Sequence, residues 1–232
     1  MDNDNQNAWI QSAQLLPVLF SHLDKNRPVS LFLRHSHRGP ISDPQKSREI
    51  PLSELGHQTS FEFGQKLPLS YLYHIFYSPL PRCKDTAFQI LQVILKNGGS
   101  GRLIAPILAL LDVGGDQRII NRILFRDGKQ YVNNWCAGLY PPDQIESSLH
   151  YSQRVMSIVC DYMKNAQTTD CFIFIGHDVN LLGLRYALSG IPADESWLDY
   201  LNGFFVQQNH DQLLISNKDK IISCPCPYWL KV

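Results

Sequence analysis

Short apolar runs alternate along the chain with segments whose apolar residues recur at helical spacing. Residues 29–33 and 171–175 are rich in apolar, strand-favouring side chains, and residues 74–77 form a shorter run of the same kind. Such runs are typical of strands buried inside a sheet. Strands that alternate with helices predict an α/β fold, a three-layer α/β/α sandwich around a central sheet.

The apolar spacing between these runs predicts the helices. Ala87, Ile90, Leu91 and Ile94 recur at intervals of three and four residues, and Asn97-Gly98 ends that helix. An N-terminal helix is predicted over residues 8–23, where Pro17 kinks it or marks its true start. Further helices are expected at 53–67, from 152 to about 163, and after 180.

The last part of the chain changes the expected sheet. Residues 204–208 and 213–216 read as two strands around a polar turn at 209–212. A hairpin places neighbouring strands antiparallel, so the sheet is predicted to be mixed, though mostly parallel. We expect one domain over residues 1–232.

Between residues 98 and 150 the pattern loosens. Gly114-Gly115 and Pro141-Pro142 interrupt it, and polar and aromatic residues alternate. We expect this segment to be a small cap insertion at the mouth of the sheet.

Charged side chains gather where the predicted strands end. The first strand is followed by Arg34, His35 and Arg38, the run at 74–77 leads to Arg82 at a helix entry, and the run at 171–175 leads to His177. Open α/β folds place ligands at such strand ends. Guanidinium groups hold phosphate oxygens in pairs, and a helix entry adds free backbone N–H groups. The convergence predicts a phosphate site.

Four motifs carry a resemblance to a known family. They are residues 34–40 (Arg-His-Ser-His-Arg-Gly-Pro), 52–56 (Leu-Ser-Glu-Leu-Gly), 78–87, and 176–180 (Gly-His-Asp-Val-Asn). In this order the chain resembles the histidine phosphatase superfamily, which contains phosphoglycerate mutases and acid phosphatases. The first and last motifs are similar to the acid phosphatase branch, and the middle two to the mutase branch. The resemblance implies a phosphomonoester hydrolase that needs neither metal nor cofactor.

The resemblance also implies roles for the residues. His35 would be the nucleophile that forms a phosphohistidine, and Arg34, Arg38 and Arg82 would bind the phosphate oxygens. His177 would donate to a phosphate oxygen. The general acid is expected to be Asp178, which matches the acid phosphatase pattern. Asp112 is the alternative, because the mutase branch carries its acid after the third strand region.

Other functions compete with hydrolysis. A mutase would return the phosphate from His35 to a second hydroxyl, and a binding module would hold a phosphorylated ligand without reaction. A metallohydrolase built on His35, His37 and Asp178 is disfavoured because Arg34 and Arg38 would repel a divalent cation.

Composition narrows the partners. The 232 residues carry 21 basic and 21 acidic side chains, so no broad basic surface indicates nucleic acid. No apolar stretch is long enough to suggest a membrane span. The polar start lacks the pattern of a secretion signal, and a cytoplasmic location is expected. Cys224 and Cys226 are one pair without a second, which is poor evidence for zinc. A small phosphorylated molecule is the expected partner.

Overall fold

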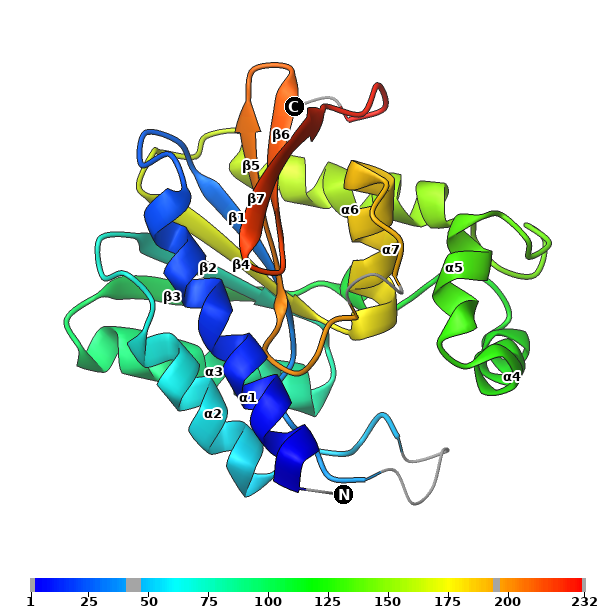
Figure 1. The fold of residues 1–232 in the computed structure, drawn as a ribbon, viewed down its shortest axis with the longest axis horizontal. Coiled ribbons are helices and arrows are strands. Elements are labelled where there is room, and N and C mark those ends of the chain that lie inside the picture. The colour runs from blue at the N-terminus through cyan, green and yellow to red at the C-terminus, as the bar shows by residue number, and fades with distance from the viewer. Residues whose placement is uncertain (1–2, 41–46, 194–196, 231–232) are drawn as a thin grey trace.

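A seven-stranded sheet forms the centre of the protein in a computed structural model that describes residues 3–40, 47–193 and 197–230 (Figure 1). The strand order is β3-β2-β4-β1-β5-β6-β7. Strands β3, β2, β4 and β1 run parallel to one another, whereas β5 pairs antiparallel with β1, and the β5–β6 and β6–β7 pairs are also antiparallel. The strands are β1 (Val29–Arg34), β2 (Leu72–Tyr77), β3 (Ser100–Pro106), β4 (Asp170–Gly176), β5 (Gly203–Asn209), β6 (Gln212–Asn217) and β7 (Lys220–Pro225).

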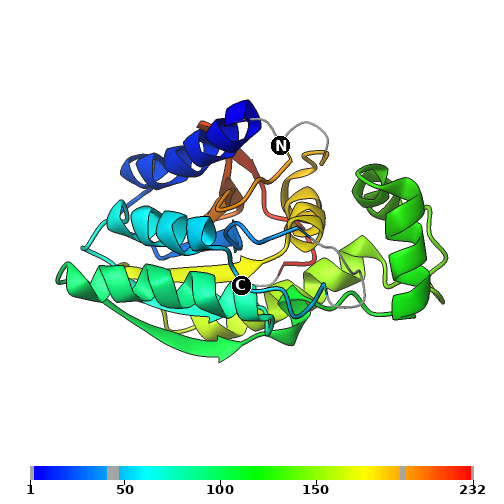
Figure 2. The same ribbon diagram turned by 90° about the horizontal axis from the view of Figure 1, so that it is seen from below.

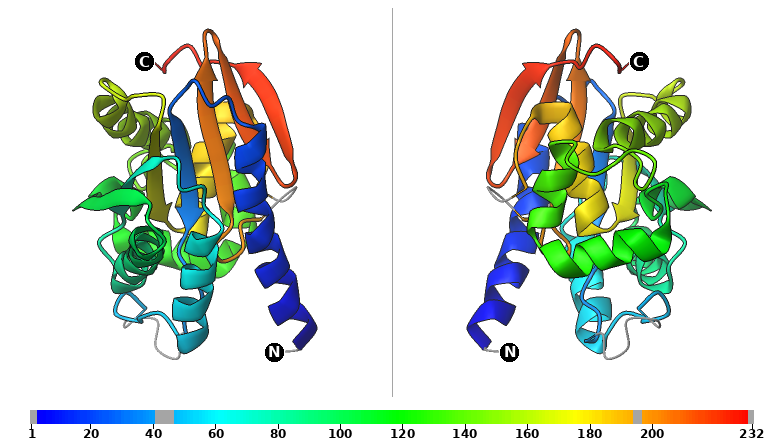
Figure 3. Two further views of the ribbon diagram at one scale, coloured as in Figure 1. Left: turned by 90° about the vertical axis from the view of Figure 1, so that its left-hand side faces the viewer. Right: turned by 90° about the vertical axis from the view of Figure 1, so that its right-hand side faces the viewer.

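Helices cover both faces of this sheet (Figure 3). One face carries α1 (Asn3–Val18), α2 (Glu54–Gln65) and α3 (Pro81–Lys96), and the other carries α6 (Ser148–Met163) and α7 (Asp178–Ser189). Alternate residues of β1 serve the two layers: Leu31 and Leu33 pack with the first group, whereas Phe32 packs with the second. The three-layer sandwich with a mixed sheet is therefore confirmed.

Helix boundaries follow local chemistry. Ser53 caps α2 by accepting a hydrogen bond from the Gly56 backbone N–H at 3.1 Å, which confirms the predicted start of that helix. The N-terminal helix was predicted five residues too late: it begins at Asn3, and after Val18 the chain continues as a short 3-10 helix over Leu19–His22. Pro17 lies in its last turn, where the helix ends rather than kinks.

Two strands were missing from the prediction. The pattern at β3 lacks a clear apolar run because this strand lies at the sheet edge and is only partly buried. The other edge strand, β7, is also largely accessible. Edge strands bury one face at most, so hydrophobic periodicity identifies them poorly.

Two outer helices stand beside the sandwich rather than against the sheet (Figure 2). They are α4 (Gln117–Asp127) and α5 (Gln130–Cys136). They lie within residues 98–150, the segment expected to form a cap, but that segment also contains β3 and the start of α6. Trp135 of α5 is buried in the core cluster that α6 and α7 share.

None of the helices in the described ranges combines the length and the apolar character that a membrane crossing would require.

Candidate active site

Three neighbouring parallel strands deliver the predicted residues to one edge of the sheet. Strands β2, β4 and β1 are adjacent, and their carboxyl ends point the same way. The backbone N–H of His35 donates to the Gly176 carbonyl at 3.0 Å, and that of Ser78 donates to the Ile175 carbonyl at 2.8 Å. These bonds tie the three loops together, so side chains far apart in sequence share one site.

His35 is held in a single neutral tautomer. Its Nε2 accepts a hydrogen bond from Arg82 Nε at 3.1 Å, and its Nδ1 lies 2.7 Å from the Ser36 carbonyl. Arginine only donates and a carbonyl only accepts, so Nδ1 carries the proton and Nε2 carries the lone pair. That lone pair faces Arg82, which is where a bound phosphate would be expected.

His177 faces His35 across the site. The two ring centroids are 5.2 Å apart at an interplanar angle of 67°. His177 Nε2 lies 3.0 Å from the Ser78 hydroxyl. His177 is the N-cap residue of helix α7. Both histidines are almost fully buried, at 3% and 9% exposure.

The arginines surround this pair. Arg34 donates to the Leu198 carbonyl at 2.7 Å, and Arg82 donates to the Ser47 carbonyl at 2.9 Å. Arg38 donates to the Gly39 carbonyl at 2.9 Å. It lies near enough to Arg82 and His177 for its positive charge to lower the pKa of both. The structure therefore brings Arg34, Arg38 and Arg82 near His35 and His177, and we call these five residues the cationic cup.

The cup keeps both imidazoles neutral. Burial lowers the pKa of His35 well below its ordinary 6.5, and the neighbouring His177, Arg82 and Arg34 lower it further. Burial likewise lowers the pKa of His177 to about 3, with Arg82 adding to the effect. His35 is therefore uncharged at neutral pH, which is the form in which an imidazole can act as a nucleophile.

Asp178 lies at the rim of the cup, in the first turn of α7. Its Oδ2 is 3.0 Å from an Arg34 Nη and accepts a longer hydrogen bond from Trp197 Nε1 at 3.3 Å. Its Oδ1 accepts from the Val179 backbone N–H at 2.9 Å. The side chain is about one quarter exposed, so a proton can reach it from solvent.

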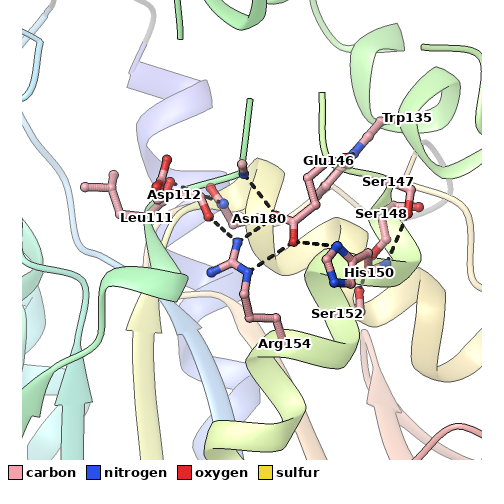
Figure 4. Close-up of polar contacts among 11 residues, drawn as sticks. Leu111, Asp112, Trp135, Glu146, Ser147, Ser148, His150, Ser152, Arg154 and Asn180 are labelled. Atoms are coloured by element: carbon pink, nitrogen blue, oxygen red, sulfur yellow. Dashed lines mark hydrogen bonds and ion pairs between the residues drawn. The ribbon is translucent and has the colours of Figure 1, made fainter. Parts of the chain in front are cut away.

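Asp112, the alternative acid, is anchored through its backbone. Its carbonyl accepts a hydrogen bond from Arg154 at 2.8 Å, and the Leu111 carbonyl accepts one from Asn180 at 3.5 Å (Figure 4). Arg154 also donates two hydrogen bonds to the Glu146 carboxylate, from Nη2 to Oε2 at 2.7 Å and from Nε to Oε1 at 3.1 Å. The same carboxylate accepts a hydrogen bond from the Gly114 backbone N–H at 2.9 Å. This network fixes the loop that carries Asp112.

Two aromatic residues of the site were not predicted. Tyr200 stacks under the Arg34 guanidinium, with 4.4 Å between the guanidinium carbon and the ring centroid, and its centroid lies 5.7 Å from that of His35. Trp197 binds Asp178, as described above. Both lie in the long connection between α7 and β5, where no periodic pattern marks them, so only the tertiary structure identifies them.

His37 lies in an aromatic contact. Its ring stacks on Trp9 of α1, and its Nδ1 lies 2.7 Å from the Ser53 hydroxyl. Strand alternation would place His37 on the face of His35, at the pocket rim, with an exposed position as the alternative. Because β1 ends at Arg34, that alternation does not extend to His37, and its rim position stays a prediction. Cys224 and Cys226 lie far from this edge and are free thiols.

Known proteins share this fold. YhfR from Bacillus stearothermophilus is 16% identical, with a TM-score of 0.57 over 84% of this chain and 98% of that one. A phosphoserine phosphatase from Entamoeba histolytica is 13% identical, with a TM-score of 0.54 over 83% and 97%. A mycobacterial glucosyl-3-phosphoglycerate phosphatase is 16% identical, with a TM-score of 0.53 over 86% and 97%.

Sequence comparison defines the family. No curated protein matches the chain significantly. A family model described as histidine phosphatase superfamily, branch 1, matches residues 31–202, which include all the residues of the cup. The chain belongs to the histidine phosphatase superfamily.

Proposed function

We propose that the protein hydrolyses a small phosphomonoester through a phosphohistidine on His35. The observation that carries this proposal is the fixed tautomer: Nε2 of a buried, neutral imidazole presents its lone pair to Arg82, with Arg34 nearby. In the first step Nε2 attacks phosphorus, an N–P bond forms, and the bond from phosphorus to the leaving oxygen breaks.

Arg34, Arg38 and Arg82 would bind the three non-bridging oxygens, and His177 would donate to one of them. Charge on those oxygens is stabilised by donors that are already in place, which is the main protein contribution to phosphoryl transfer. In the free protein Arg82 occupies the Nε2 lone pair. Phosphate binding would draw this guanidinium onto an oxygen and release the nucleophile.

Asp178 is the proposed general acid. It would give its proton to the leaving oxygen as the P–O bond breaks, and its carboxylate would then accept a proton from the attacking water. Water cleaves the N–P bond and regenerates neutral His35, so atoms and charges balance over the two steps. Its position beside Arg34 and His177 supports this choice over Asp112, whose recorded hydrogen bonds run through its backbone.

The substrate class follows from the neighbours and the site. The two phosphatases named above act, by their names, on phosphoserine and on a glucosyl phosphoglycerate. A small phosphorylated metabolite is therefore the proposed substrate. We propose that the reaction needs no metal, because a divalent cation beside His35 would meet the charges of Arg34 and Arg82. The outer helices α4 and α5 are proposed as the cap. A cytoplasmic location remains a prediction that cell fractionation would check.

A panel of phosphorylated metabolites, assayed with wild type and His35→Ala in the presence of a chelator, tests the proposal. We expect release of inorganic phosphate by wild type alone, together with an acid-labile phosphoenzyme. Transfer of the phosphate to a second hydroxyl instead of water would identify a mutase. Phosphate binding without turnover would identify a binding module, and either result would overturn the proposed hydrolysis.

A further inference from the structure

Helix α1 contacts the active site although it lies outside the residues that the family model matches. That match begins at residue 31, whereas α1 spans Asn3–Val18. In Figure 1 the helix, drawn in blue, crosses beside α2. Helix α1 is thus an element outside the residues that the family model matches.

Trp9 connects this helix to the catalytic loop. Its side chain is 8% exposed and stacks on His37, with ring centroids 5.9 Å apart and an interplanar angle of 9°. Tyr200 closes the cluster: its ring meets Trp9 edge-on at 5.7 Å and His37 edge-on at 5.1 Å. We name Trp9, His37 and Tyr200 the aromatic wedge.

The wedge touches the reacting groups on its other side. Tyr200 supports the Arg34 guanidinium at 4.4 Å and lies against His35 at 5.7 Å. The Nε of Arg34 is buried and has no hydrogen-bond partner among the described residues. The contact with the Tyr200 ring therefore helps to orient this guanidinium, together with its hydrogen bond to the Leu198 carbonyl and its ion pair with Asp178.

A second route from α1 reaches the same arginine. Ser12 accepts a hydrogen bond from the Asn202 side-chain amide at 2.5 Å. The Asn202 carbonyl in turn accepts from the Arg34 backbone N–H at 2.9 Å. One turn of α1 is thus linked to the Arg34 backbone through Asn202 and to the Arg34 side chain through Tyr200.

We propose that α1 is a positioning element of the active site, in which Trp9 acts through His37 and Tyr200 to hold Arg34 and His35 in place. The proposal rests on the function assigned above to those two residues. Small displacements of a phosphate-binding group reduce turnover strongly, because catalysis in phosphoryl transfer depends on preset geometry. Removal of the Trp9 ring deprives the Tyr200 ring of one of its packing contacts.

The test compares two truncations in one helix of the full chain. Trp9→Ala removes the wedge contact, whereas Leu16→Ala removes a core side chain of the same helix that is 2% exposed and belongs to the cluster beneath α1. Both variants destabilise the fold. At a temperature where both are folded, we expect Trp9→Ala to lower kcat on an aryl phosphate about tenfold. Leu16→Ala should keep the wild-type kcat, and Trp9→Phe should recover most of the loss.

Calorimetric binding of inorganic phosphate gives a readout that does not require turnover. We expect Trp9→Ala to weaken this binding about tenfold, while Leu16→Ala leaves it unchanged. The effects of Trp9→Ala and Tyr200→Leu should be less than additive, because both act on the same contact.

The outcomes separate the two proposals. If wild type binds phosphate but does not turn over, the hydrolase assignment fails and the binding data still decide the role of α1. If Trp9→Ala matches Leu16→Ala in both kcat and phosphate affinity, α1 only adds stability and the inference is wrong. Full additivity of Trp9→Ala and Tyr200→Leu would also overturn it.

Discussion

Arg82 donates from Nε to Nε2 of His35 at 3.1 Å, and this bond places the lone pair of the ring on Nε2, the nitrogen that we propose attacks phosphorus. Because the guanidinium cannot accept, the lone pair of His35 is directed into the cup. Arg82 is 9% exposed and is the second residue of helix α3. Its position is therefore set by the fold rather than by a ligand.

Replacing Arg82 should therefore reduce the stabilisation of the transition state more than it weakens substrate binding. We expect Arg82→Ala to lower kcat/KM by about 10² to 10³, the range typical of losing one preset donor to a developing charge. Arg82→Lys keeps the charge but not the paired donors, so it should recover only part of the rate. Steady-state kinetics of both variants check this, and equal rates for Arg82→Lys and wild type would contradict it.

The general acid can be identified by the leaving group. An alkyl phosphate needs a proton on its leaving oxygen, whereas a nitrophenyl phosphate needs little help. We expect Asp178→Asn to slow the alkyl substrate about 10²-fold or more and the aryl substrate less than tenfold. Asp112→Asn is the matched control and should treat both substrates alike. The reverse pattern would assign the acid to Asp112.

The sequence predicted that the residues of the cationic cup lie near one another because a residue that directly follows a strand lies at the end of that strand. His35 directly follows β1 and His177 directly follows β4, so once the strands are recognised their meeting point is determined. Arg82 was found for a related reason, since α3 begins one residue before it. These positions depend on local pattern and on topology, which sequence reveals.

Contacts that join distant segments were beyond the same reasoning. Trp9 meets Tyr200 across nearly the whole chain, and nothing in the spacing of either residue indicates the other. Glu146 lies before helix α6 and Arg154 within it, eight residues on, so their spacing does not indicate that both contact the Asp112 loop. Such side-chain contacts are set by tertiary packing, which overrides local preference.

Burial of His177 makes stability depend on pH. Its pKa is lowered to about 3 in the folded protein, against 6.5 for the ordinary side chain, so between these values the unfolded chain binds more protons. Stability should fall as the pH is lowered from about 6.5 toward 3. We expect His177→Gln to flatten this decline, as measured by urea unfolding at pH 7 and pH 5. An unchanged slope would show that His177 is protonated at little cost.

The Glu146–Arg154 pair should stabilise the loop that carries Asp112. Glu146 is 8% exposed at its side chain. Burial alone would raise its pKa, but the hydrogen bonds from Arg154 and Gly114 hold that pKa below the ordinary 4.5. Removing one partner leaves a poorly hydrated charge, so Arg154→Met should lower the free energy of unfolding by ~2–3 kcal/mol at pH 7.

The sign of the pH effect makes this prediction specific. A carboxylate with a lowered pKa contributes stability above its unfolded pKa and loses it as the pH falls. The gap between wild type and Arg154→Met should therefore shrink below about pH 4.5. The exposed pair of Asp116 and Arg118, 3.2 Å apart, supplies the control: Arg118→Met should leave stability unchanged. A gap that stays constant from pH 7 to pH 4 would mean that Arg154 contributes by packing rather than by charge.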